Sequence, residues 1–257
     1  MKTFRMIDFE TTGFPPCAGV VEVGCCDVIV APDSAPVICE PWSTLVNPFR
    51  ANPDLVMHTK AQAVYQITVD DLVDAPSVDE GFRRATDGAD AFVANNAEFE
   101  RQFFGGAGKP WICTLRAARR AWPDEESHSL QTLRFSRNLP IVDREYARAA
   151  HRAGPDAYVT AFLFVELMRA GLTPETMIAG SDGLALLPRM PFGKHKGAKF
   201  EDIPFDYLKW LRGTTNDANV KHTIAHEMRR RSAASRAGVA GPTHGRRLVS
   251  STPIGGF

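Results

Sequence analysis

The sequence lacks the features that place a protein in a membrane or send it through one. No apolar run approaches the roughly 20 residues that a membrane-spanning helix needs. Near the start, Lys2 and Arg5 are followed within a few residues by the acids Asp8 and Glu10 instead of a long apolar stretch, so we expect no signal peptide. The five cysteines have no CxxC spacing and no His or Cys pairs at the spacing of zinc ligands. These absences argue against a zinc site and predict free thiols in a reducing cytoplasm.

The chain as a whole also has no net charge, but its charged residues are unevenly distributed along the sequence. There are 30 basic and 30 acidic residues. Residues 189–257 hold 13 of the basic and 5 of the acidic ones, a net charge of +8, which leaves −8 for residues 1–188. An acidic body with a basic C-terminal region suits a protein that gathers carboxylates around metal ions and binds a polyanion elsewhere. Solvated basic helices would give the same pattern, so charge alone leaves both interpretations open.

The pattern of strands and helices predicts an α/β protein with a mixed sheet. Residues 2–8 and 19–31 indicate strands, the second rich in Val and Ile. Residues 156–170 indicate the clearest helix, with apolar side chains at core spacing and Gly171 as its end. Strands that come first and then mix with helices are typical of an α/β domain.

The sequence also predicts that the chain is divided into four segments. We expect a catalytic domain over 1–172 and a linker over 173–188, which is punctuated by Pro and Gly. A small α-rich C-terminal module should cover 189–231, and a flexible basic tail should cover 232–257.

Two carboxylates end the first predicted strand, in the segment DFETTG. Asp8 and Glu10 are two residues apart, so their side chains project from the same face of a strand. Gly13 follows and allows a sharp turn. A DxE pair is weak evidence by itself, because a surface pair on a strand is the commoner explanation.

Two later segments carry further candidate residues at the starts of predicted helices. Residues 95–100 (NNAEFE) place Glu98 and Glu100 in a first helical turn, where acids also suit the helix dipole. His151 lies five residues before Asp156, which opens the long predicted helix. Taken singly, Asp156 would be an ordinary N-terminal acid and His151 an ordinary surface histidine.

The three segments together, in this order and spacing, resemble the motifs of the DEDDh 3′→5′ exonucleases, the family of the DNA polymerase III epsilon proofreading subunit and of RNase T. DFETTG is similar to the first motif, NNAEFE to the usual His-Asn-Ala-x-Phe-Asp, and His151 with Asp156 to His-x4-Asp. Shorter segments are similar as well: VVEVG (20–24), LVNP (45–48) and SHSLQTLR (127–134). The resemblance covers roughly residues 2–172 and implies an RNase H-like mixed sheet flanked by helices.

The resemblance also implies a nuclease site with two divalent cations, Mg²⁺ with Mn²⁺ as a substitute. Asp8 would contact both ions, and Glu10 and Asp156 would bind one. Glu100 would support the second ion. His151 would act as general base and take the proton from the attacking water, because imidazole changes its charge near neutral pH.

The chain departs from the family pattern at two positions. Asn95 stands where the second motif usually has histidine. Glu100 stands where the family has a metal-binding aspartate, and it is longer by one methylene. Since Mg²⁺ demands near-octahedral geometry, we expect activity to be retained, with slower turnover or greater tolerance of Mn²⁺. Glu98 is a weaker candidate for the same role.

Four residues near these motifs are candidates for substrate binding. Thr11, Thr12 and Phe14 take the positions at which the family contacts the terminal nucleotide, and Asn96 would help to hold the substrate strand. Phe14 has two equal alternatives, stacking on a base or packing locally in the core.

The C-terminal module carries a second resemblance. Its segments PFGKHKG (191–197) and DYLKWL (206–211) resemble the C-terminal extension of the exonuclease X group, deoxyribonucleases of the same family, which favours DNA over RNA. We expect Lys194, Lys196 and Lys199 to meet phosphates without choosing a sequence. Tyr207 or Trp210 could stack on bases, but for these aromatic residues we favour packing in the module's own core.

The sequence therefore predicts an enzyme that removes nucleotides from DNA 3′ ends, with single strands favoured and no membrane partner. One alternative is an RNA-trimming exoribonuclease like RNase T or oligoribonuclease, because the catalytic motifs do not distinguish the two sugars. The other is a nucleic-acid-binding protein with a weakened nuclease site, which Glu100 alone supports.

Overall fold

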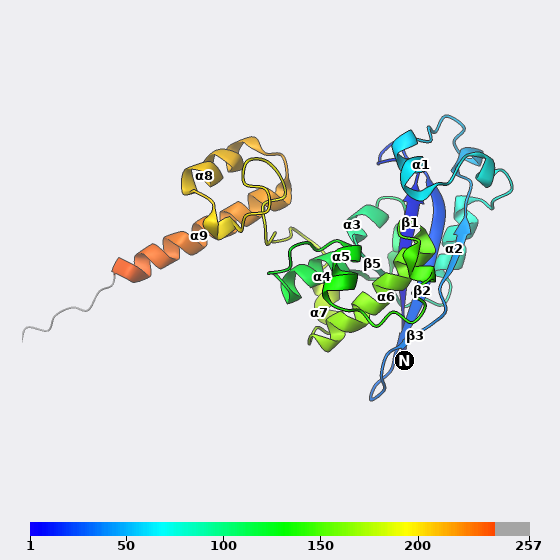
Figure 1. The fold of residues 1–257 in the computed structure, drawn as a ribbon, viewed down its shortest axis with the longest axis horizontal. Coiled ribbons are helices and arrows are strands. Elements are labelled where there is room, and N and C mark those ends of the chain that lie inside the picture. The colour runs from blue at the N-terminus through cyan, green and yellow to red at the C-terminus, as the bar shows by residue number, and fades with distance from the viewer. Residues whose placement is uncertain (240–257) are drawn as a thin grey trace, which may run out of the picture. The chain divides into compact units, whose positions relative to one another are not determined.

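The computed structural model describes residues 1–239, with side chains through residue 233. The chain divides into two units, Met1–Gly183 and Leu184–Phe257, and each is described by itself (Figure 1). Most of the expected tail, residues 240–257, lies outside the described residues.

A six-stranded mixed sheet forms the centre of the first unit. Its strand order is β3-β2-β1-β5-β6, and β4 also pairs with β2. The β1–β2, β2–β3 and β2–β4 pairs are antiparallel, whereas β1–β5 and β5–β6 are parallel. The strands are β1 (Lys2–Thr11), β2 (Val20–Val30), β3 (Val37–Ile38), β4 (Trp42–Leu45), β5 (Ala91–Ala94) and β6 (Trp111–Cys113).

Helices flank this sheet and complete the predicted α/β architecture. In the first unit they are α1 (Thr59–Tyr65), α2 (Val78–Thr86), α3 (Ala97–Glu100), α4 (Thr114–Ala121), α5 (Leu130–Ser136), α6 (Ala153–Arg169) and α7 (Pro174–Ala179). Short 3-10 turns lie at Pro48–Arg50, Asp70–Leu72, Gly106–Gly108, Tyr146–Arg148 and Phe200–Asp202. The second unit holds α8 (Phe205–Thr214) and α9 (Ala218–Val239).

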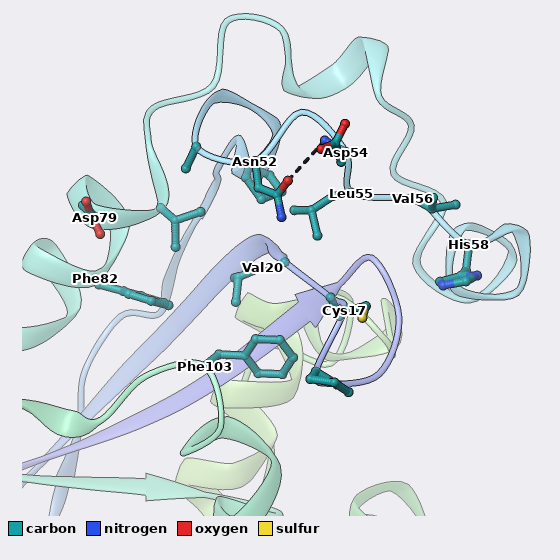
Figure 2. A pocket seen from close by; sticks show the side chains of 16 residues that line it. Cys17, Val20, Asn52, Asp54, Leu55, Val56, His58, Asp79, Phe82 and Phe103 are labelled. Carbon is teal, nitrogen blue, oxygen red and sulfur yellow. Dashed lines mark hydrogen bonds between the residues drawn. The ribbon is translucent and has the colours of Figure 1, made fainter.

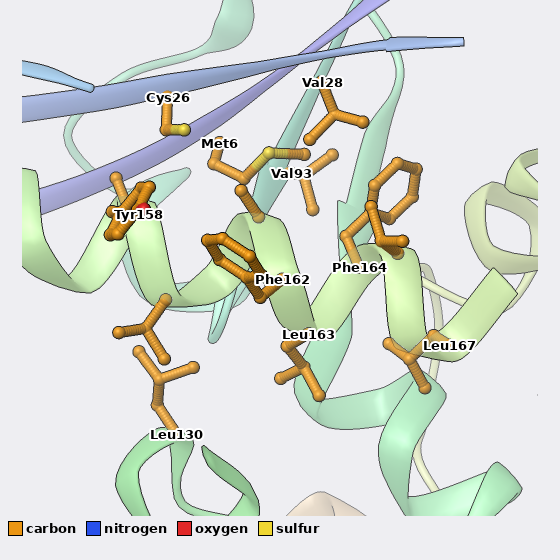
Figure 3. Close-up of a cluster of buried hydrophobic side chains, with 14 of the residues drawn as sticks. Met6, Cys26, Val28, Val93, Leu130, Tyr158, Phe162, Leu163, Phe164 and Leu167 are labelled. Atoms are coloured by element: carbon orange, nitrogen blue, oxygen red, sulfur yellow. The ribbon is translucent and has the colours of Figure 1, made fainter. Parts of the chain in front are cut away.

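Alternation along β1 gives the sheet two different apolar faces. Phe4 and Met6 face the long helix α6, in a cluster with Leu163 and Phe164 (Figure 3). On the opposite face, Ile7 and Phe9 belong to a separate cluster that also contains Phe92 and residues of α2. Because side chains alternate along a strand, the residues after Met6 that share its face are Asp8 and Glu10.

The region expected to be a linker contains structure. Helix α7 begins at a capping box in which Thr173 and Thr176 exchange side-chain and backbone hydrogen bonds. Met177 is buried in the α6-side core, and the Ser181 hydroxyl accepts a hydrogen bond from the Cys113 N–H at 2.8 Å. Residues 173–183 therefore belong to the first unit. At the other end, α9 continues past Ser232, where we expected the tail to begin.

The second unit has its own small core, formed by Met190, Phe200, Ile203, Leu208, Leu211, Val220 and Ile224. Tyr207 packs against this core, as expected, but Trp210 is 58% exposed and lies outside it. On the helix α8, Leu208 and Leu211 occupy the buried face, and Trp210 points away from it. Our expectation of core packing was thus wrong for Trp210.

Within the described part of the chain, we find no helix that is both long enough and apolar enough to cross a membrane.

Candidate active site

Strand β1 delivers two carboxylates to one end of the face that α6 covers. Asp8 lies opposite Gly24 of β2, and Glu10 lies opposite Glu22. Both acids are half-buried. The strand thus presents two charges on the α6 side of the sheet, immediately beyond the apolar cluster.

Helix α6 brings the third carboxylate, and Gly24 allows it to come close. A Cβ atom on Gly24 would overlap backbone atoms of Ala153 and Gly154, so the first turn of α6 rests directly on β2. Asp156 follows in the same turn. A ligand oxygen of each of Asp8, Glu10 and Asp156 lies within 4.8 Å of the others.

These three acids are electrostatically unfavourable as bare carboxylates. Burial, followed by the charges of Asp156 and Glu10, raises the pKa of Asp8 well above its ordinary value. Burial, followed by Asp156 and Glu22, raises the pKa of Glu10 to about 8, although Arg152 opposes the shift. Burial also raises the pKa of Asp156. Such a cluster favours either protons or a bound cation.

Glu100 ends α3 beside this cluster and is only 4% exposed. It is not among the three acids that share the 4.8 Å set. Burial, with a smaller effect of Glu10, raises its pKa to about 8. Its Oε2 atom is buried and has no hydrogen-bond partner among the described residues. A buried carboxylate oxygen in that state is costly unless a cation or proton binds it, so Glu100 fits a metal site. Glu98 instead is exposed and pairs with Arg116 at 3.4 Å.

His151 sits on the loop just before α6, where its backbone N–H donates to Asp156 Oδ2 at 3.0 Å. Its φ of 62° lies in the left-handed region, which costs a residue other than glycine roughly 1–2 kcal/mol. The side chain is exposed. The hydrogen bond to Asp156 therefore holds an exposed imidazole next to the carboxylate cluster.

An ion pair that we did not predict fastens the same loop to the sheet. Arg152 binds Glu22 with two hydrogen bonds of 2.9 Å, and the Ala153 N–H donates to Glu22 at 3.1 Å. Glu22 is buried, at 1% exposed, and lies opposite Glu10 in the sheet. A second unpredicted partner, Gln131 of α5, donates to Asp156 Oδ1 at 3.0 Å. Glu22 lies in the segment VVEVG and Gln131 lies in SHSLQTLR. The similarity of these two segments to the family could therefore have indicated both residues as part of the site.

A pocket of about 890 Å³ opens directly beside Glu10. Its lining includes the aromatic residues Phe14, Tyr65 and Phe99, together with Thr11. Phe14 is 84% exposed, and its ring centroid is 6.3 Å from that of Phe99 in an edge-on arrangement. Aromatic residues thus line the pocket next to the carboxylate cluster.

The remaining predicted substrate residues have structural partners. Thr11 Oγ1 donates to the Gly13 carbonyl at 2.7 Å, and Thr12 Oγ1 accepts from the Gly19 N–H at 3.0 Å, so both threonines shape the β1–β2 turn. Asn96 is exposed at the start of α3. Lys194, Lys196 and Lys199 all lie in the second unit.

A second pocket, of about 790 Å³, is lined in part by residues of the β1–β2 turn (Figure 2). Val20, Leu55, Phe82 and Phe103 give it a largely apolar wall, and Cys17 of the turn also lines it. Neither Asp8 nor Glu10 lines it. This second pocket is therefore separate from the carboxylate cluster.

Comparison with known proteins identifies the family. Exodeoxyribonuclease 10 of Escherichia coli (strain K12) is 33% identical over 211 residues, which cover 80% of this chain and 89% of that protein. The chain belongs to the exodeoxyribonuclease 10 family. The resemblance to the DEDDh, DnaQ-like exonucleases that the motifs indicated is thus confirmed.

Further matches agree with membership of the exodeoxyribonuclease 10 family. DNA polymerase III subunit epsilon of Aquifex aeolicus is 27% identical over 177 residues, covering 65% of this chain and 80% of that protein. The solved structure "Exonuclease X in complex with 5' overhanging duplex DNA" matches with 31% identity and a TM-score of 0.56, over 70% of this chain and 99% of that chain. These matches confirm the RNase H-like fold.

One family model matches the beginning of the second unit. It covers residues 184–215 and is described as "Putative quorum-sensing-regulated virulence factor". The match spans the loop that contains Gly193 and Gly197, together with α8.

Proposed function

We propose that this protein is a metal-dependent 3′→5′ exonuclease that hydrolyses the terminal phosphodiester bond of DNA. The observation that carries the proposal is the convergence of Asp8, Glu10 and Asp156, with ligand oxygens within 4.8 Å of one another, on residues of the family motifs. Membership of a family with a curated exodeoxyribonuclease supports the reaction and the choice of DNA. The RNA-trimming alternative is separated by the digestion assay below.

The donor set fits divalent cations that prefer oxygen, with Mg²⁺ as the physiological ion and Mn²⁺ as a substitute. Asp8, Glu10 and Asp156 would hold one ion, and Asp8 with Glu100 would hold the other. The unpartnered Oε2 of Glu100 supports its inclusion. When bound, two such ions neutralise phosphate charge, activate water and stabilise the leaving oxygen.

The chain's own residues then have separate tasks. His151 accepts the proton of the attacking water, and its hydrogen bond to Asp156 keeps it beside the acids. Glu22 acts on position, because it binds the side chain of Arg152, which follows His151, and the N–H of Ala153. His151 is therefore a catalytic residue in this proposal, and Glu22 is a positioning residue.

The pocket beside Glu10 would receive the 3′-terminal nucleotide. Phe14 and Phe99 offer ring faces and edges for stacking, which is worth roughly 1–3 kcal/mol per base and tolerates any sequence. The backbone of Thr11 and Thr12 and the side chain of Asn96 would contact the sugar and phosphate. A terminal base must leave its partner to enter such a pocket, so single-stranded 3′ ends are the favoured substrate.

The second unit would add affinity for the DNA backbone through Lys194, Lys196 and Lys199. Its match to a described family model gives no activity, so this part of the proposal rests on charge. A cytoplasmic location belongs to the same proposal and rests on the free thiols, of which Cys25, Cys26 and Cys113 are buried.

The decisive experiment is digestion of 5′-labelled oligonucleotides of matched sequence as single- and double-stranded DNA and RNA, each with Mg²⁺ and with Mn²⁺. The wild-type protein should shorten single-stranded DNA from its 3′ end in steps of one nucleotide. Asp8→Asn should abolish this activity, because it removes a charge from the acids that would hold the ions. His151→Ala should reduce turnover by at least about 100-fold, as expected for a general base, while metal-free DNA binding stays within twofold.

The matched control is Asp54→Asn, which changes an exposed acid in the neighbouring pocket and should retain full activity. A normal nuclease rate in Asp8→Asn would rule out this site. Faster digestion of RNA than of DNA would replace the DNA assignment by the RNA-trimming alternative.

A further inference from the structure

Three aromatic rings form a row on the second unit. The ring centroids of His195 and Tyr207 are 4.5 Å apart, and those of Tyr207 and Trp210 are 5.4 Å apart. Trp210, at the end of the row, is 58% exposed. The core of the unit is formed by other side chains, so core packing does not account for the exposed indole.

The loop that carries His195 has a defined shape. The Gly197 N–H donates to the Met190 carbonyl at 2.8 Å, and the Ala198 amide donates to the His195 carbonyl at 3.0 Å. Gly193 and Gly197 have φ values of 74° and 84°, which glycine adopts readily. A Cβ atom on Gly193 would lie 3.1 Å from the Tyr207 hydroxyl, so the loop is seated against this ring.

Basic residues outnumber acidic ones in the segment that carries this row. Lys194 and Lys196 are exposed on either side of His195. Residues 189–212 contain six Lys or Arg residues and three Asp or Glu residues. Exposed rings next to exposed cations are the combination that binds single-stranded nucleic acid, because the rings stack on bases and the cations meet phosphates.

We propose that the row His195–Tyr207–Trp210 is a stacking platform for the bases of single-stranded DNA, with the backbone of the strand bound by Lys194 and Lys196. The proposal deepens the proposed function, on which it rests for the choice of DNA. In a duplex the base faces are already covered by their neighbours, so the platform distinguishes single strands from duplexes. It does not choose a sequence, because every base offers a π-face.

The test measures binding of fluorescein-labelled dT20 to the full-length protein by anisotropy, in EDTA so that no cleavage occurs. Trp210→Ala should raise the Kd about tenfold, the loss expected from one stacked base, and Trp210→Phe should lie between. Phe205→Ala is the matched control, since Phe205 is 44% exposed on the same helix but takes no part in the row. Its Kd should stay within twofold of wild type. Thermal unfolding checks that every variant is folded.

A second oligonucleotide isolates stacking from charge. A 20-residue abasic DNA has the same phosphates without bases, and wild type and Trp210→Ala should bind it equally. An unchanged Kd for dT20 in Trp210→Ala would overturn the proposal, as would an equal loss of affinity for the abasic strand or for blunt duplex DNA.

Cleavage of dT20 with Mg²⁺ is measured separately. Trp210→Ala should raise KM about tenfold and leave kcat within twofold, because the row is not placed in the catalytic site. If the wild-type protein fails to cleave dT20, the proposed exonuclease function falls, while the Kd values still decide the platform.

Discussion

At the scale of single residues, the site depends on acids that the fold holds together against their mutual repulsion. Burial and neighbouring carboxylates raise the pKa of Asp8, and they raise the pKa of Glu10 to about 8. Protons and cations therefore compete for the same oxygens. The carboxyl groups that repel one another in the bare protein are the groups that would bind the ions.

Glu22 offers a test of positioning at this scale. Glu22→Gln keeps the shape of the side chain but removes its charge, which weakens the hydrogen bonds to the Arg152 side chain and to the Ala153 N–H. We expect the free energy of unfolding to fall by about 1.5–3 kcal/mol, the range for hydrogen bonds to charged groups, with Arg152's partial exposure favouring the lower end. Turnover should fall about tenfold while KM changes less than twofold, measured by denaturant unfolding and steady-state kinetics.

Glu145→Gln is the control for that substitution. Glu145 pairs with Arg148 at 2.8 Å, but both side chains are largely exposed, so its loss should cost less than about 0.5 kcal/mol. Turnover of Glu22→Gln equal to wild type would remove Glu22 from the catalytic machinery.

Glu100 allows the family departure to be tested directly. Glu100→Asp shortens the buried acid by one methylene, so we expect the ratio of Mg²⁺-supported to Mn²⁺-supported activity to rise at least threefold, because Mg²⁺ is the stricter ion. Loss of one buried methylene should cost about 1 kcal/mol of stability. Glu100→Gln, which keeps the length, should lower activity with both ions. An unchanged Mg²⁺ to Mn²⁺ ratio in Glu100→Asp would show that side-chain length does not set the preference.

At the scale of elements, the contact of α6 with β2 at Gly24 decides where Asp156 lies. Gly24→Ala introduces a methyl group where the backbone of Ala153 already lies, which should cost about 1–3 kcal/mol or more. It should also shift the first turn of α6 away from β1 and lower activity at least tenfold. The measurements are thermal unfolding and the single-stranded digestion rate at a temperature where the variant is folded.

Gly105→Ala is a suitable control, because a Cβ atom there would meet nothing within 4 Å and its φ is −69°. It should leave both quantities unchanged. If Gly24→Ala loses stability but keeps full activity, the close approach is structural only.

Most elements could be predicted from local pattern. The strand expected over 19–31 is β2. The sequence pattern of Ser77 followed three residues later by Glu80 predicts a capping box, and this capping box begins α2. The pattern over residues 38–46 predicts a single strand, but the chain forms two short strands there, β3 and β4. Helix α7 was missed because Pro174 and Gly180 resemble punctuation, whereas Pro174 begins the helix and Gly180 ends it.

Only those site residues that lie in the family motifs could be predicted from the sequence. Asp8, Glu10 and Asp156 were proposed as one site, and the structure brings them together. The pairing of Glu22 with Arg152 depends on the register of β2 and on where α6 packs against the sheet. Neither can be predicted from local sequence pattern. Trp210 was misjudged because an aromatic residue at helical spacing is more often buried, and only the packed core shows that it is left out.

At the scale of the whole molecule, the acidic cluster predicts how stability depends on pH. Glu10 and Glu100 have pKa values raised to about 8 in the folded protein. A raised carboxyl pKa favours the folded state at low pH, and this contribution is lost as pH rises from about 4.5 to 8. In EDTA the Tm should therefore fall between pH 5.5 and pH 8.5. Mn²⁺ should raise the Tm more at pH 8.5 than at pH 5.5, because the ligands must lose their protons first.

The control for this prediction is Glu10→Gln, which removes one of the carboxyl groups with a raised pKa and should flatten the fall in Tm measured in EDTA. Differential scanning fluorimetry across the pH range is sufficient. A Tm in EDTA that rises with pH over this interval would contradict the assigned pKa shifts.

The position of Asp156 in the chain has a consequence for biosynthesis. Asp8 is synthesised well before Asp156, which belongs to the helix that ends at Arg169. The two meet only after the 147 residues between them have been translated. A ribosome-bound fragment that stops before α6 cannot assemble the cluster. An incompletely translated chain should therefore have no nuclease activity, because the carboxylate cluster forms only when most of the catalytic unit has been synthesised.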